Sequence, residues 1–175
     1  GQEFAFGYYS KPALIGWVIG AVTALAGSDA PFWVRAPGAV FHGATALILA
    51  ALGARLIGGR AAIWVAASYV TLPMATLGSL LASTDTIMAP FFAAALYFHA
   101  RLAETRLLRF ALAAGAMAGM AFLAKYAGAY FLLGVALGAL LPALRIGWGN
   151  AAALVAAFAL VVAPNIWWNL ANGLA

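Results

Sequence analysis

Long apolar runs, separated by short clusters of charged residues, prolines and glycines, make up most of this chain. A helix that crosses a membrane needs about 20 mostly apolar residues. Six runs approach that length, and each is bounded by charges or by helix-breaking residues. The pattern predicts six spans, over 36–56, 61–82, 86–100, 107–124, 128–144 and 151–168.

A seventh apolar run, over 12–26, is shorter and lies between Lys11 and the polar residues that begin at Gly27. We predict an interfacial or re-entrant helix here and not a span. The expected fold is an all-α polytopic membrane protein with a single transmembrane domain. Residues 1–35 would form an outer loop that contains the interfacial helix, and residues 36–170 a six-helix bundle.

The composition supports a membrane protein. Hydrophobic residues make up 67% of the chain and charged residues only 7%, whereas soluble domains are about 25% charged. The net charge of +5 comes from scattered residues, and no basic patch is interleaved with aromatic residues. We therefore expect no nucleic-acid partner. The absence of cysteine excludes disulfides and thiolate metal sites.

The arginines are distributed unevenly between the predicted loops. Six of the seven fall in loops on one side of the bundle: Arg55, Arg60, Arg101, Arg106, Arg109 and Arg145. Loops rich in Lys and Arg usually face the cytoplasm. The sequence therefore predicts that this side is cytoplasmic and that both termini lie outside.

The opposite, outer side carries a mixed polar set. Its members are Lys11, Asp29, Arg35, Asp85, Lys125, Asn165, Asn169 and Asn172. Ionisable residues at membrane depth are costly, so they indicate a functional site by default.

Structural roles are the alternatives to function. Lys11 can extend from an interfacial helix to the headgroups, and Asp85 can cap a helix N-terminus. Lys125 can pair with Asp85 or with a lipid phosphate, and Asn165 and Asn169 can form hydrogen bonds across the bundle.

Two further sets of residues point to packing. We expect His42 and His99, each alone in an apolar run, to be ordinary packing residues. The glycine spacings at Gly16 and Gly20, Gly115 and Gly119, and Gly134 and Gly138 favour close approach of neighbouring helices. Pro73, Pro90 and Pro164 lie within predicted spans, and each favours a kink in its helix.

Five segments, in this order and on this outer side, resemble motifs of the family 39 glycosyltransferases. These membrane enzymes are related to protein O-mannosyltransferases and to the lipid A aminoarabinose transferase. The matching segments are Gly-Tyr-Tyr-Ser-Lys-Pro-Ala-Leu-Ile (7–15), Val-Arg-Ala-Pro (34–37), Ser-Thr-Asp (83–85), Phe-Leu-Ala-Lys-Tyr (122–126) and Pro-Asn-Ile-Trp-Trp-Asn (164–169).

The resemblance implies a GT-C-like fold and roles for individual residues. Lys11 matches the lysine that contacts the carrier phosphate, and Asp85 matches an acidic position that orients the site or the sugar. Tyr9 and Lys125 are further substrate-binding candidates. Arg35 and Asn169 are candidates for the wall of the site.

One departure concerns the main catalytic base. The family carries an acidic pair, usually Asp-Glu, in its first outer loop, and the resemblance places that pair upstream of Gly1. We therefore expect this chain to be a fragment, truncated at both ends and inactive alone.

The resemblance implies transfer of a sugar from a polyprenyl-phosphate carrier to a lipid, glycan or protein acceptor. The site would face the periplasm or exterior of a bacterial inner membrane and contact membrane lipid. A carboxylate would activate the acceptor hydroxyl, and cations would stabilise the departing phosphate. The sugar, the acceptor and a divalent metal requirement are left open. The alternative is a transporter or lipid-handling protein with a polar outer cavity.

Overall fold

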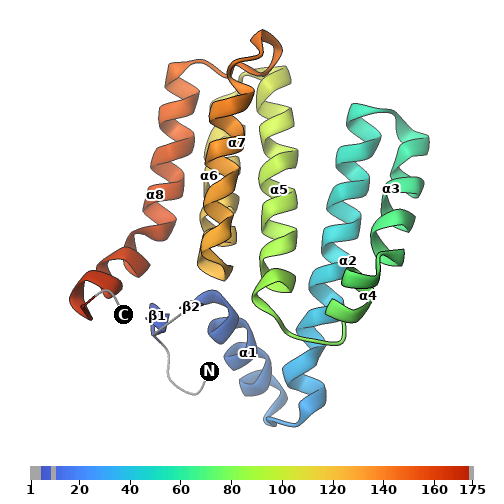
Figure 1. The fold of residues 1–175 in the computed structure, drawn as a ribbon, viewed down its shortest axis with the longest axis vertical. Coiled ribbons are helices and arrows are strands. Elements are labelled where there is room, and N and C mark those ends of the chain that lie inside the picture. The colour runs from blue at the N-terminus through green and yellow to red at the C-terminus, as the bar shows by residue number, and fades with distance from the viewer. Residues whose placement is uncertain (1–4, 9–10, 174–175) are drawn as a thin grey trace.

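The structure is a computed structural model that describes residues 5–8 and 11–173, and this part of the chain is a helical bundle with one short hairpin (Figure 1). The elements in order are β1 (Gly7–Tyr8), β2 (Lys11–Pro12), α1 (Leu14–Ala26), α2 (Pro31–Leu56), α3 (Gly59–Thr71), α4 (Pro73–Gly78), α5 (Thr84–Thr105), α6 (Leu108–Ala124), η1 (Tyr126–Ala129), α7 (Tyr130–Gly138), η2 (Pro142–Leu144) and α8 (Trp148–Ala171). The predicted all-α class is confirmed.

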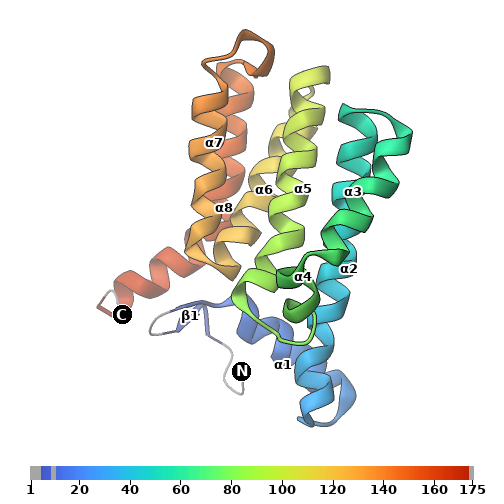
Figure 2. The same cartoon turned by 45° about the vertical axis from the view of Figure 1, so that its right-hand side comes forward.

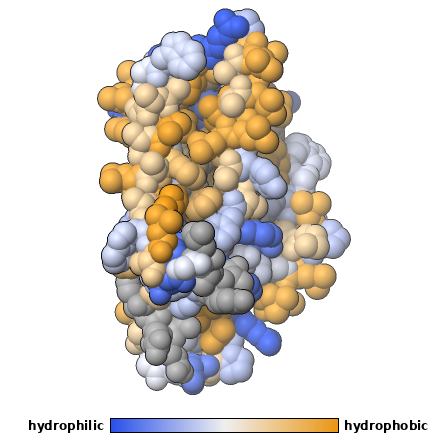
Figure 3. All heavy atoms as spheres, turned by 60° about the vertical axis from the view of Figure 1, so that its left-hand side comes forward, coloured by the Kyte–Doolittle hydropathy of each residue, from blue (hydrophilic) through white to orange (hydrophobic). Residues whose placement is uncertain are grey.

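Three of the described helices, α2, α5 and α8, are long and apolar enough to cross a membrane. The predicted spans over 107–124 and 128–144 correspond to shorter apolar helices, and so does the predicted interfacial segment. On the face drawn in Figure 3, hydrophobic side chains cover much of the surface along the helices, and hydrophilic ones gather toward the two ends. The fold is that of an all-α membrane protein.

The prediction of one continuous helix over 61–82 was wrong. α3 ends at Thr71, Leu72 is extended, and α4 begins at Pro73 with a different direction (Figure 2). Proline lacks a backbone N–H and disfavours helical conformation in the residue before it. A kink at Pro73 was predicted, but the end of the helix there was not, because the residues on both sides of Pro73 are apolar.

The other helix bounds differ less from the prediction. α2 begins at Pro31, so Arg35 lies inside this helix and not before it. α7 ends at Gly138, and a turn leads to η2 at Pro142, so the predicted helix over 128–144 is cut short. α8 changes direction in its last part (Figure 1), where Pro164 lies within the helix.

α6 lies at the centre of the bundle and packs against α5 and α8. Its contact with α8 depends on glycine: a Cβ on Gly115 would lie 2.1 Å from the carbonyl oxygen of Leu154, and one on Gly119 would lie 2.8 Å from Val161 Cβ. The predicted close approach at this glycine pair is therefore confirmed. The core around α5 and α6 combines four alanines with four larger buried side chains, namely Leu102, Phe131, Ile146 and Leu154.

The bundle has two chemically different ends. The arginine end, where α2 and α5 finish and α8 starts, carries the six arginines named above (Figure 1). At the other end, called the lysine end here, α5 and η1 begin, α6 and α8 finish, and the hairpin and α1 lie across the helix ends (Figures 1 and 2). Lys11, Asp85 and Lys125 all belong to the lysine end.

Candidate functional site at the lysine end

A two-stranded hairpin delivers Lys11 to this end of the bundle. β1 and β2 are antiparallel, with Tyr8 opposite Lys11 and Gly7 opposite Pro12. Gly7 lies directly on the ring of Trp168, since a Cβ there would be 2.4 Å from a ring carbon. The hairpin is therefore seated on the last turns of α8, and the Lys11 side chain is exposed.

Hydrogen bonds from two helices hold the residues that precede the hairpin. Asn165 of α8, only 2% exposed, donates from Nδ2 to the carbonyl oxygen of Phe6 at 2.7 Å. Trp17 of α1 donates from Nε1 to the carbonyl oxygen of Ala5 at 2.8 Å. Asn169 in turn donates to the carbonyl oxygen of Asn165 at 2.9 Å. The predicted alternative was hydrogen bonding across the bundle, but Asn169 bonds within α8 and Asn165 bonds the N-terminal segment. The outcome is an anchored N-terminal segment.

Asp85 and Lys125 form an ion pair, with Lys125 Nζ 2.6 Å from Asp85 Oδ1. Asp85 lies in the first turn of α5, and Lys125 lies between α6 and η1. The predicted alternative that Asp85 caps the helix is wrong, because Ser83 is the N-cap and accepts from the Thr86 N–H. Both side chains are substantially exposed, at 64% and 42%. Exposed pairs contribute only about 0.2–1 kcal/mol, so an anionic ligand can compete for Lys125.

A second, smaller buried core contains residues that are close in the chain to each of the three charged residues. It consists of residues next to or near Lys11, Asp85 and Lys125 in the chain, namely Leu14, Ile87, Leu123 and Ala124. Lys11 and Asp85, 74 positions apart in the sequence, therefore lie at the same end of the bundle.

A half-open cleft of about 480 Å³ adjoins Asp85 between α2, α3, α4 and the start of α5. The polar residues of its lining include His42, Tyr69, Asp85 and Thr86, and most of the other lining residues are apolar. His42 Nδ1 lies 2.7 Å from the Tyr69 hydroxyl, and His42 Nε2 lies 3.3 Å from the Thr86 hydroxyl. Sequence reasoning missed this arrangement: His42 is not a simple packing residue. Its partners lie 27 and 44 positions away, and no local pattern reveals them.

The remaining predicted site residues lie in different places. Arg35 is exposed on α2 and lines a separate hollow with Phe32 and Leu80, so it does not join the cleft beside Asp85. Asn169 is half-buried and supports the anchor of the N-terminal segment. Tyr9 lies outside the described residues. Within residues 5–8 and 11–173, no group of three or more His, Asp or Glu side chains is arranged to hold a metal ion.

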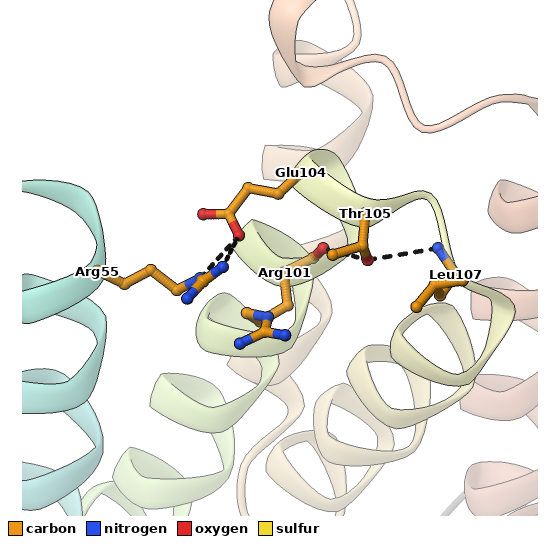
Figure 4. Close-up of polar contacts among 5 residues, drawn as sticks. All are labelled: Arg55, Arg101, Glu104, Thr105 and Leu107. Atoms are coloured by element: carbon orange, nitrogen blue, oxygen red, sulfur yellow. Dashed lines mark hydrogen bonds and ion pairs between the residues drawn. The ribbon is translucent and has the colours of Figure 1, made fainter.

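A second ion pair marks the arginine end. Arg55 Nε donates to Glu104 Oε2 at 2.7 Å and links the end of α2 to the end of α5 (Figure 4). Arg101, drawn beside this pair in Figure 4, lies over the ring of Phe110 at 4.9 Å. Arg55 and Arg101 thus interact with other side chains of the protein. Lys11 has no ion-pair partner among the described residues.

Comparison with known proteins identifies the family. The family model described as dolichyl-phosphate-mannose-protein mannosyltransferase matches residues 10–168. The chain belongs to this family. The match covers most of the chain, from the hairpin to the end of α8, and includes Lys11, Asp85 and Lys125. The resemblance inferred from the sequence motifs is therefore confirmed for this mannosyltransferase family.

A curated relative lies close in sequence. The chain is 43% identical over 170 residues to the lipid A galacturonosyltransferase RgtD of Rhizobium johnstonii, which covers 97% of this chain. The chain spans only 36% of that relative's length. No solved structure matches the chain.

Proposed function

We propose that this mannosyltransferase-family chain is the membrane-embedded part of a glycosyltransferase that moves a sugar from a polyprenyl-phosphate carrier to an acceptor. The observation that carries the proposal is the convergence of Lys11, Asp85 and Lys125 at the end of the bundle opposite the arginines. Family membership and the galacturonosyltransferase relative support it.

Lys11 is the residue best suited to the carrier phosphate. Its ammonium is exposed on a hairpin seated against α8, near the expected headgroup plane. As the sugar leaves, negative charge builds up on the carrier phosphate, and a nearby cation stabilises that charge. A lysine acts on phosphate as a compact point charge.

Asp85 orients the site by positioning Lys125. Its Oδ1 accepts from Lys125 Nζ at 2.6 Å. We propose that Asp85 holds Lys125 until the donor arrives, and that Lys125 then shares the phosphate with Lys11. The base would be another carboxylate of the intact protein.

The proposed donor and acceptor follow from the relative. A lipid A galacturonosyltransferase 43% identical to this chain makes a polyprenyl-phosphate galacturonosyl donor and a lipid A acceptor the first pair to test. The site would then face the periplasm of a bacterial inner membrane, with the arginine end in the cytoplasm, as the positive-inside rule predicts.

Transfer by the intact protein in membranes tests the proposal. We expect Lys11→Ala to lower kcat by on the order of a hundredfold, the range for loss of one charge-stabilising group. Asp85→Asn should also lower transfer strongly, and membrane insertion should be unchanged in both.

The matched control lies at the other end of the bundle. Arg55→Ala removes a charge from the second ion pair, far from the proposed site, and should leave transfer near the wild-type rate. Wild-type transfer by both Lys11→Ala and Asp85→Asn would remove these residues from the mechanism.

A further inference from the structure

His42 connects three elements at the lysine end. Its ring nitrogens reach the Tyr69 hydroxyl on α3 (2.7 Å) and the Thr86 hydroxyl in the first turn of α5 (3.3 Å). The backbone of Gly78 passes so close that a Cβ there would lie 2.7 Å from His42 Nε2. The His42 ring therefore forms polar contacts in addition to packing against its neighbours.

Buried hydroxyl and carbonyl groups surround the His42 ring. Thr86 is only 1% exposed, and its hydroxyl lies within hydrogen-bond distance of His42 Nε2 (3.3 Å) and of the carbonyl oxygen of Gly78 (3.3 Å). One ring nitrogen of a neutral histidine donates and the other accepts, and a hydroxyl can do either, so both ring nitrogens can be satisfied by Tyr69 and Thr86. The His42 ring thus ties α5 to α2 and α3.

The network ends beside Asp85. Ser83 caps α5 by accepting from the Thr86 N–H at 3.1 Å, and its hydroxyl lies 2.9 Å from the Thr86 hydroxyl. Asp85 lies between these two residues in the same turn. Any rotation or shift of this turn moves the Asp85 carboxylate relative to Lys125, which lies between α6 and η1.

We propose that His42 is a positioning residue that acts through Thr86 to fix the first turn of α5 and so directs Asp85 toward Lys125. The importance of this for sugar transfer rests on the function proposed above. The claim that His42 positions Asp85 does not rest on that function, and it can be tested without any sugar donor or sugar acceptor.

Cross-linking between positions 85 and 125 measures this geometry. This chain has no cysteine. With any cysteine elsewhere in the intact protein replaced, Asp85→Cys combined with Lys125→Cys gives one reactive pair in membranes. A short bismaleimide reports the approach of the two positions. We expect His42→Phe, which keeps a ring but removes both hydrogen bonds, to lower the cross-linking yield several-fold.

Two conservative variants separate the two hydrogen bonds of His42. A glutamine amide at position 42 can place a polar atom near the Nε2 position and so keep the bond to Thr86, whereas an asparagine amide places one near the Nδ1 position and keeps only the bond to Tyr69. The proposal predicts near wild-type yield for His42→Gln and a low yield for His42→Asn. Thr86→Val should lower the yield as His42→Phe does, so the test remains if the phenylalanine variant fails to fold.

The second ion pair supplies the matched control. Arg55→Cys with Glu104→Cys reports the same kind of contact at the arginine end, and its yield should not change with His42→Phe. An equal fall at both pairs would mean that His42 stabilises the fold as a whole and would overturn the proposal. Wild-type yield for the 85–125 pair in both His42→Phe and Thr86→Val would overturn it too. Loss of transfer in Lys11→Ala has no bearing on this result.

Discussion

At the scale of single residues, the sequence revealed charged groups better than their partners. Lys11, Asp85 and Lys125 are detectable because charges are rare in this chain, and pairing of Lys125 with Asp85 was among the predicted alternatives. His42 was missed because its hydrogen bonds reach Tyr69 and Thr86, across 27 and 44 positions. Such contacts depend on helix packing, which hydropathy does not encode.

Asn165 provides a residue-scale test of how the hairpin is anchored. Asn165→Ala removes the hydrogen bond from the buried Asn165 side chain to the carbonyl oxygen of Phe6, and a typical hydrogen bond contributes about 0.5–1.5 kcal/mol to stability. We expect a lower midpoint of thermal unfolding in detergent and faster proteolysis near the hairpin.

The control for this variant is Asn172, the residue that follows the last residue of the same helix. Asn172 is exposed and donates to the carbonyl oxygen of Trp168 at 2.8 Å. Asn172→Ala should change the free energy of unfolding by no more than about 0.5 kcal/mol, as is usual for surface substitutions. Equal effects of the two variants would show that the buried hydrogen bond does not anchor the segment.

At the scale of elements, hydropathy located the helices but not all their ends. The start of α6 was predicted within one residue, because charges bound that run closely. A kink at Pro73 was predicted but not the end of α3 there, and the early end of α7 was missed, because apolar residues continue past both points. Backbone sterics at Pro73 decide the first of these ends, and a window that averages hydrophobicity does not contain that information.

The contact between α6 and α8 gives an element-scale prediction. In Gly115→Ala the added methyl group meets the backbone of α8, because the Cβ would be 2.1 Å from the carbonyl oxygen of Leu154. The helices must separate, at a cost of about 1–3 kcal/mol for overpacking. The midpoint of thermal unfolding should fall.

Gly134 on α7 is the matched control, since a Cβ there meets no atom within 4 Å. Gly134→Ala should leave stability unchanged or raise it by up to about 1 kcal/mol, the difference in helix propensity between the two residues. If Gly115→Ala proves as harmless as Gly134→Ala, the close packing of α6 on α8 is not what holds the bundle together.

At the scale of the whole molecule, the division of charge between the two ends was predictable from the sequence. Along the chain, loops that carry the six arginines alternate with segments that carry the mixed Lys, Asp and Asn set. In the structure these segments lie at opposite ends of the bundle, because successive long helices run in opposite directions (Figure 1). The hairpin and the cleft beside Asp85 were not predictable, because both arise where several elements meet. The central claim is that the lysine end is the outer, phosphate-binding end.

Labelling of a single cysteine next to Lys125 tests this claim most directly. Tyr126 is 40% exposed at the lysine end, and Arg60 is exposed at the arginine end. In right-side-out membrane vesicles that contain the intact, cysteine-free protein, Tyr126→Cys should react with a membrane-impermeant maleimide, and added polyprenyl phosphate should slow the reaction several-fold. Arg60→Cys should react only after permeabilisation. The reverse pattern, with Arg60→Cys labelled from outside and Tyr126→Cys protected until the vesicles are opened, would contradict the account.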